Sequence, residues 1–212
     1  MRFALVAFTA ALLGPALRAD DTADFLQKDN WEGLPHLWTH DGKSIVGETK
    51  EDPKFNTFYC SKAKYADFEL SFKVLMRDGV GNSGVQIRSK LLDDEKNKGK
   101  FVVAGPQADM GQQYWGSLYG EKFTKDGTIG NGHMMKACPT NFVKDHVNPK
   151  EWNDYSIAVK GKHVTIKMNG QTSVDDEFAY LPADGIIAFQ IHAGFPKMRV
   201  EFKEFTFKNL TK

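Results

Sequence analysis

The feature that most constrains the fold is an alternation of apolar and polar residues, with a period of two, that recurs from residue 56 onward. In FELSFKVLM (68–76), the apolar side chains at even positions would share one face while polar side chains face the other way. YSIAVK (155–160) and HVTIKM (163–168) repeat this pattern on either side of a two-residue connection. Helical periodicity is weak, so the pattern predicts strands that are buried on one face.

Further strands and turns complete the prediction of fold class. Asn169-Gly170 is a strong hairpin-turn signal, and GIIAFQIHAG (185–194) and MRVEFKEFTFKNL (198–210) supply the last strands. In the final strand the apolar phase shifts between Phe202 and Phe205, which predicts a β-bulge. Residues 91–100 are expected to be a charged connection, and residues 121–149 a long loop region with short ordered pieces at most. The sequence therefore predicts an all-β fold, a two-sheet antiparallel β-sandwich, as one domain over residues 22–210.

The N-terminus has the pattern of an export signal. Arg2 precedes an apolar run from Phe3 to Leu13, and small residues follow at Gly14, Ala16 and Ala19. This arrangement predicts a secretory signal peptide over residues 1–19, cleaved after Ala16 or after Ala19, and a periplasmic or secreted protein. The apolar run is too short to span a bilayer, and no other stretch approaches that length.

Charge and cysteine content exclude several classes of partner and site. The 28 basic and 27 acidic side chains nearly balance, which argues against a nucleic-acid partner. Cys60 and Cys138 are compatible with one disulfide or with two buried free thiols. The sequence contains neither a CxxC motif nor a Cys/His cluster, so no structural zinc site is predicted. No cofactor is predicted, although scattered Asp, Asn and carbonyl oxygens leave open a single divalent ion. Oligomeric state is not predicted.

Residues 101–120, FVVAGPQADMGQQYWGSLYG, combine glycines, aromatic rings and polar side chains as ligand sites do. Gln107 and Asp109 are two positions apart, so they share a face if the backbone is extended. Trp115 and Tyr119 suit two roles. They are compatible with stacking on the apolar face of a sugar ring and with ordinary packing in the core.

The strand GIIAFQIHAG carries a second group of candidates. Its Ile187, Phe189 and Ile191 would share one face, while Gln190 and His192 lie on the other. A histidine at that position suits a general acid or base because its pKa lies near working pH. The alternative is a rim strand with a solvated histidine.

A third candidate is Arg88, in GVGNSGVQIRS (79–89). Strand alternation would place it on the same face as Gln86, where the planar guanidinium is suited to clamp hydroxyls or a carboxylate. A surface ion pair is the alternative. The glycines before it do not form a phosphate-binding loop, because no Gly-Lys-Ser/Thr ending follows.

Several segments, in this order, resemble the 3-keto-disaccharide hydrolase domain family over about residues 25–210. They are YADFELSFKV, GNSGVQIRS, AGPQADMGQQYWGSLYGE, EWNDYSIAVKGKHVTIKMNGQ, GIIAFQIHAG and EFKEFTFKNL. The resemblance implies a concanavalin-like or laminin-G-like jelly roll, often exported by bacteria. It also implies hydrolysis of glycosides already oxidised to a ketone at C3, with an upstream sugar 3-oxidoreductase as a partner.

The implied chemistry assigns roles to the candidate residues. A C3 ketone acidifies the C2 proton, so the reaction needs a base near C2, a donor to the ketone oxygen and an acid for the leaving group. His192 would be base or acid, and Asp109 its partner or the second proton carrier. The remaining candidates would bind the sugar hydroxyls and the C3 oxygen or form a stacking platform; they are Arg88, Gln107, Gln190, Trp115 and Tyr119.

Two further classes of function stay open beside the enzyme: a non-catalytic carbohydrate-binding module and an envelope-structural protein. Convergence of Asp109 and His192 on one concave pocket would favour the enzyme, because a binding module needs only rings and amides. One departure bears on this choice. Many family members carry Gly-Tyr-Glu-x-Gln or Gly-Tyr-Gln where this chain has Gly105-Pro106-Gln107. If the Glu of those members acts in their chemistry, its absence here predicts a different substrate or a loss of catalysis.

Overall fold

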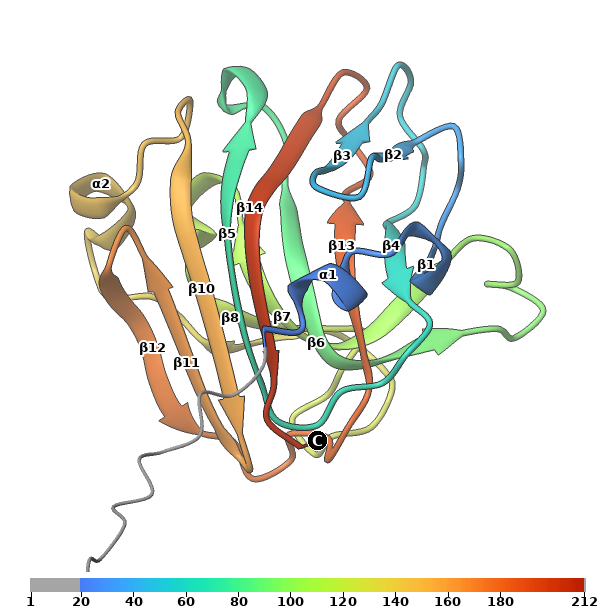
Figure 1. The fold of residues 1–212 in the computed structure, drawn as a ribbon. Helices are drawn as coiled ribbons and strands as arrows, with labels where there is room; N and C mark the ends of the chain where they lie inside the picture. The colour runs from blue at the N-terminus through green and yellow to red at the C-terminus, as the bar shows by residue number, and fades with distance from the viewer. Residues whose placement is uncertain (1–19, 212) are drawn as a thin grey trace, which may run out of the picture.

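The computed structural model describes residues 20–211, in which fourteen strands pair into two antiparallel sheets. Figure 1 shows the two sheets packed face to face, which confirms the predicted sandwich. Sheet A has the order β1 (Trp31–Glu32), β4 (Thr57–Ser61), β13 (Ile186–Ile191), β6 (Ser83–Leu92), β7 (Val102–Met110), β8 (Leu118–Glu121), β9 (His133–Lys136). Sheet B has the order β12 (Gln171–Glu177), β11 (His163–Met168), β10 (Asn153–Lys160), β5 (Phe68–Met76), β14 (Arg199–Asn209), β3 (Ile45–Glu48), β2 (Trp38–His40).

Helical segments are short and lie outside the sheets. They are α1 (Thr22–Phe25), η1 (Lys28–Asn30), η2 (Arg77–Gly79), η3 (Gln112–Tyr114) and α2 (Phe142–His146). Between residues 20 and 211 no helix is long and apolar enough to cross a membrane. The predicted signal peptide, residues 1–19, lies outside the described residues.

The main core fills the space between the sheets and follows the alternation of the sequence. Phe189 of β13 packs on Phe202 of β14, with ring centroids 4.6 Å apart, and on Phe72 of β5 at 6.2 Å. Ile187 and Ile191 lie in the same cluster, so the predicted inward face of residues 185–194 is confirmed. Burial of apolar area of this kind is the dominant favourable contribution to such a fold.

The bulge predicted in the last strand is present. The pairing of β14 with β5 shifts register between Lys203 and Thr206, and Glu204 between them has a positive φ of 54°. The extra residue keeps both Phe202 and Phe205 on the core side of the strand.

A bend in the β6–β7 hairpin shapes the outer face of sheet A. The pairing of β6 with β7 shifts register between Gln86 and Lys90. Within this stretch Arg88 has a positive φ of 48°, and Gly105 on the opposite strand has a φ of 150°. Gly105 is needed there, because a Cβ atom would lie 2.2 Å from the Ser89 hydroxyl oxygen. Beyond the bend the hairpin, green at the right of Figure 1, extends past β4. There the Phe58 N–H donates to the Phe101 carbonyl at 2.9 Å.

The bent hairpin covers a second, smaller core on the outer face of sheet A. Its buried members come from β4, β7 and β13: Phe58, Cys60, Val103, Ile186 and Ala188. Leu91 and Phe101 of the hairpin pack against them. Residues 185–194 are therefore apolar on both faces for most of their length, and their polar side chains appear only near the end.

Both cysteines are free in the described part of the chain, which answers the question left open by the sequence. Cys60 lies in the outer core and Cys138 packs against the main core. Within residues 20–211 no group of three or more His, Cys, Asp or Glu side chains is arranged to hold a metal ion.

Candidate active site

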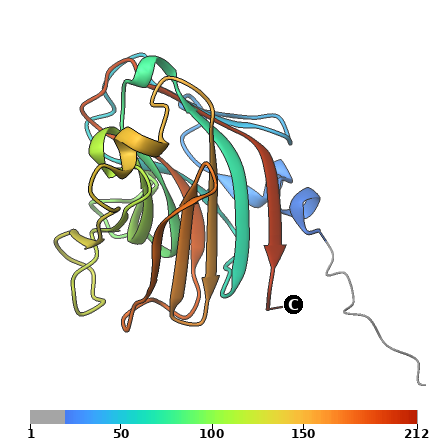
Figure 2. The same ribbon diagram turned by 90° about the vertical axis from the view of Figure 1, so that its left-hand side faces the viewer.

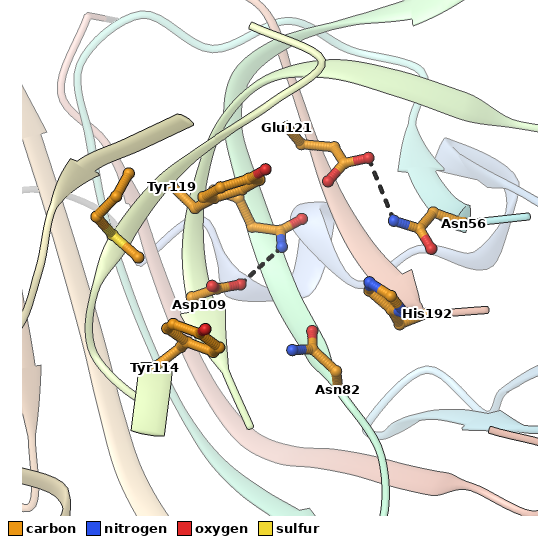
Figure 3. A pocket seen from close by; sticks show the side chains of 9 residues that line it. Asn56, Asn82, Asp109, Tyr114, Tyr119, Glu121 and His192 are labelled. Atoms are coloured by element: carbon orange, nitrogen blue, oxygen red, sulfur yellow. Dashed lines mark hydrogen bonds between the residues drawn. The ribbon is translucent and has the colours of Figure 1, made fainter. Parts of the chain in front are cut away.

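A concave pocket of about 530 Å³ opens on the outer face of sheet A, beside the bent hairpin. Figure 3 shows its side chains converging on one space; they come from β7, β8, β9, the η3 turn and the loops that flank β4, β6 and β13. The lining residues are Asn56, Asn82, Gln107, Asp109, Tyr114, Tyr119, Glu121, Met134 and His192. Four of the seven site residues predicted from the sequence are thus brought together: Gln107, Asp109, Tyr119 and His192.

Asp109 lies in the floor of the pocket and is the most strongly perturbed acid there. Its neighbours Ala108 and Met110 point into the main core, so strand alternation turns the Asp109 carboxyl toward the pocket. Only 5% of the residue is exposed, and this burial raises its pKa to about 7. A hydrogen bond from Gln107 opposes the shift, while the charge of Glu121 adds to it. Asp109 can therefore exchange a proton near neutral pH.

A chain of buried amides holds the Asp109 carboxylate in place. The Ser89 hydroxyl donates to Gln86 Oε1 at 2.6 Å, and Gln86 Nε2 donates to Gln107 Oε1 at 2.7 Å. Gln107 Nε2 then donates to Asp109 Oδ1 at 2.8 Å (Figure 3). Along this chain of hydrogen bonds each amide accepts through its oxygen and donates through its nitrogen, so the orientation of the Gln107 amide is fixed. One carboxylate oxygen of Asp109 is thereby occupied.

His192 stands on the far side of the pocket from Asp109 (Figure 3). Its Nδ1 lies 2.6 Å from the Ala193 carbonyl oxygen, which can only accept, so Nδ1 carries the hydrogen. In the neutral ring Nε2 then keeps its lone pair and is the basic nitrogen. The turn after His192 is held by Asn56, whose Oδ1 accepts from the Ala193 N–H at 3.0 Å.

Glu121 is a second carboxyl group in the pocket wall and is not among the residues predicted from the sequence. Asn56 Nδ2 donates to Glu121 Oε1 at 3.2 Å, which connects it to the His192 turn (Figure 3). Burial raises the pKa of Glu121, and its hydrogen bond to Asn56 partly offsets this. Glu121 pairs in register with Gly105. A carboxyl group is thus present beside the Gly105-Pro106-Gln107 segment, although that segment itself contains none.

The prediction of Trp115 as a stacking platform is not supported by its position. Trp115 is 1% exposed and belongs to the main core, whereas the preceding residue, Tyr114, lines the pocket with Tyr119. Tyr114 is the last residue of η3, and the backbone leaves the helical turn at Trp115, whose ψ is 123°. Tyr114 and Tyr119 are the rings available to a ligand.

Arg88 is also not in the pocket. The bulge at its positive φ reverses the predicted alternation and sends the side chain to the opposite end of the sandwich. There it donates to Asp67 Oδ1 and to the Gly161 carbonyl, both at 2.6 Å, and to the Ala66 and Pro182 carbonyls. With 1% of its side chain exposed, Arg88 connects strands and turns and has no contact with the pocket.

Gln190 lies behind the pocket floor. It is fully buried, and its Oε1 accepts from Gln107 Nε2 at 3.2 Å, but it does not line the cavity. It therefore supports Gln107 from below.

The sequence does not predict five of the lining residues. Glu121 follows Tyr119 by two positions, so the rule that pairs Gln107 with Asp109 would also have found it. Asn56, Asn82 and Met134 carry no local signal, since only the order of strands brings their loops and edges to this pocket.

Comparison with known proteins gives a family and a fold. A family profile described as a 3-keto-alpha-glucoside-1,2-lyase-like domain matches residues 22–210. No match is found among curated proteins. A solved structure of a provisionally assigned glycosyl hydrolase from Parabacteroides distasonis ATCC 8503 has a TM-score of 0.58 at 20% identity, covering 86% of this chain and 89% of that one. A second such structure from the same organism has a TM-score of 0.56 at 22% identity, covering 86% and 94%.

The fold is also shared with a binding protein. The carbohydrate-binding module CBM66 from Bacillus subtilis has a TM-score of 0.57 at 13% identity, covering 84% of this chain and 95% of that one. At these identities the solved structures show a common jelly-roll sandwich and no more. The family profile spans nearly all the described residues, and the chain belongs to the 3-keto-alpha-glucoside-1,2-lyase-like domain family.

Proposed function

We propose that this protein is an exported enzyme that cleaves glycosides already oxidised to a ketone at C3. The observation that carries the proposal is that Asp109 of β7 and His192, directly after β13, face one polar cavity although they are distant in the sequence. A buried carboxyl group whose pKa is about 7 lowers the stability of the folded protein at neutral pH, and simple sugar binding does not need one. Family membership supports the same substrate class. Export rests on the sequence pattern at residues 1–19.

In the proposed first stage, His192 Nε2 removes the proton from C2, and the electrons of that C–H bond form an enolate with the C3 ketone. The enolate then expels the leaving group: a C1–C2 double bond forms, the C1–oxygen bond breaks, and Asp109 gives its proton to the departing oxygen. Asn82 and Tyr119 line the same cavity and supply donors for the C3 oxygen.

The second stage returns the enzyme to its starting state. Water adds to C1 of the enone while the Asp109 carboxylate accepts one of its protons. The His192 imidazolium then returns a proton to C2. The products are the free 3-keto-sugar and the leaving alcohol, and both side chains regain their original protonation. A sugar 3-oxidoreductase acting earlier would supply the ketone.

The direct test is release of the leaving group by the purified protein from a 3-keto-glucoside and, separately, from the unoxidised glucoside. We expect cleavage of the keto form alone, reduced about 10²–10⁴-fold by His192→Ala, the usual contribution of a general acid or base. The matched control is His36→Ala, at an exposed position away from the pocket. Sugar binding without cleavage by the wild-type protein would instead identify a carbohydrate-binding module.

The aromatic wall gives a second prediction. Tyr114→Ala should weaken binding of the unoxidised glucoside about tenfold, since a stacked ring contributes about 1.4 kcal/mol. Tyr180→Ala removes a ring of the same type at a position that is 60% exposed and outside this pocket, and should leave binding unchanged. Titration calorimetry measures both. Equal affinities for the two variants would exclude Tyr114 from the platform.

A further inference from the structure

A second cavity, of about 600 Å³, lies beside the proposed active site. It is formed between η3 and residues 137–144, the segment that leads into α2, and Figure 2 shows η3 and α2 next to one another. Tyr114 and Met134 line both this cavity and the catalytic pocket. The two cavities are therefore direct neighbours that meet at these two side chains.

The two cavities differ in chemistry. The catalytic pocket presents two carboxyl groups, an imidazole and three amides. The second cavity has an apolar wall made of Met134, Ala137, Cys138, Pro139, Phe142 and Val143. Its polar members are at exposed positions and contain no acidic group: Gln112, Gln113, Thr140, Asn141 and Lys144, together with the buried hydroxyl of Ser117. Contiguous apolar side chains left open beside a polar site indicate a ligand with an apolar part.

The apolar wall is built into the fold. Phe142 is 4% exposed and belongs to the main core. Its N–H donates to the Pro139 carbonyl at 3.0 Å, which closes a turn, and the Cys138 N–H donates to the Ser117 hydroxyl oxygen at 3.0 Å. The first bond holds the segment in a turn, and the second ties it to Ser117, directly before β8, so the cavity exists before a ligand arrives and little order has to be gained on binding.

We propose that this second cavity, the aglycone cavity, binds a flat apolar or aromatic leaving group of the glycoside whose sugar ring occupies the catalytic pocket. The proposal rests on the function proposed above and narrows it to aryl glycosides. An aromatic ring would cover the apolar wall and displace water from it. A second sugar in the same position would instead place some of its hydroxyls against the apolar wall and away from the polar side chains at the rim, which is unfavourable.

The first test compares two 3-keto-glucosides, one with a phenyl and one with a methyl leaving group. Ala137 is exposed and lines the aglycone cavity, so Ala137→Trp fills the cavity from its rim. We expect the ratio of kcat/KM for the phenyl over the methyl substrate to fall about tenfold, because the variant removes the favourable burial of one aromatic ring. Ala63→Trp, at an exposed position outside both cavities, is the control. An unchanged ratio in Ala137→Trp would overturn the proposal.

The second test needs no turnover and so separates this proposal from the proposed function. Cys138 lines the aglycone cavity, whereas Cys60 is 1% exposed and burial raises its pKa, so N-ethylmaleimide should label Cys138 alone. Cys138→Ser confirms the site of labelling. We expect saturating unoxidised phenyl glucoside to slow labelling at least about fivefold, while methyl glucoside at the same occupancy does not.

The outcomes distinguish the two proposals. Protection by the phenyl glucoside without cleavage of any 3-keto-glycoside would reject the catalytic function and retain the aglycone cavity. Cleavage of 3-keto-glycosides with equal labelling rates under both glucosides would retain the catalytic function and reject the aglycone cavity. Protection by a disaccharide as strong as that by the phenyl glucoside would also overturn the proposal, because it would make the second occupant a sugar.

Discussion

Asp109→Asn is expected to lower kcat for a 3-keto-glycoside about 10²–10⁴-fold, the range expected for loss of a general acid. Asparagine keeps an oxygen that can accept the hydrogen bond from Gln107 Nε2, so the amide chain to Gln86 stays satisfied. What is lost is the exchangeable proton. The comparison variant is Asp93→Asn, which makes the same change on the exposed 93–100 loop.

The same variant should be more stable than the wild type above neutral pH. Burial raises the pKa of Asp109 to about 7 from 3.8, so between these values the unfolded chain loses this proton while the folded protein keeps it. The contribution of Asp109 to the free energy of unfolding therefore becomes less favourable as pH rises from about 4 to about 7. At pH 8 the full penalty, at most about 4 kcal/mol, is removed by Asp109→Asn. Below pH 3.8 the two proteins should differ little.

Activity and stability thus give two readouts for one substitution. With Asp109 as the acid, kcat/KM of the wild type should fall as pH rises through about 7, and this limb should be missing from the residual activity of Asp109→Asn. Stopped assays from pH 5 to 9 and urea denaturation at pH 4 and pH 8 measure the two effects. Activity that rises through pH 7 in the wild type, with that rise missing from Asp109→Asn, would assign Asp109 as the base instead.

Arg88→Met should be the most destabilising substitution discussed here, by about 3 kcal/mol. Breaking a buried ion pair costs about 3–5 kcal/mol, and the lower end applies because a third of the Asp67 side chain, 35%, is exposed. The carbonyls of Ala66, Gly161 and Pro182 also lose a donor. The matched change is Arg77→Met, which breaks an ion pair whose arginine is 53% exposed and should cost less than about 1 kcal/mol.

Urea denaturation followed by tryptophan fluorescence measures both arginine variants, with the shift in midpoint converted through a common slope. A stable Arg88→Met protein that no longer binds sugar would contradict the structural role and favour the role that the sequence predicts. An equal loss of stability in both variants would show that the burial of Arg88 has no special weight.

The alternation of apolar and polar residues predicts the sandwich because each strand has to bury one face, and that requirement is local. It also predicts the bulge of β14, where the apolar phase visibly shifts between Phe202 and Phe205. The bulge at Arg88 leaves no such trace, since the apolar phase of Val85 and Ile87 continues up to it. The orientation of Arg88 is therefore predicted wrongly, although the strand itself is predicted correctly.

In the candidate site, too, local alternation predicts some positions and not others. Because side chains alternate along a strand, Gln107 and Asp109 share a face, and His192 lies on the face opposite the core residues before it, so these positions are predictable. Which of two adjacent rings, Tyr114 or Trp115, reaches the pocket depends on a single short turn. The contributions of Asn56 and Asn82 depend on which strands become neighbours, and no local pattern contains that information.

The strand order also has a consequence for how the protein matures. β13 inserts between β4 and β6, and β14 inserts between β3 and β5, so each sheet is completed by one of the last two strands. A nascent chain that lacks these residues has a gap in both sheets and cannot place His192 opposite Asp109. Such long-range pairing is slow to form and leaves strand edges open meanwhile. The pocket that brings Asp109 and His192 together therefore cannot form until the last two strands have paired.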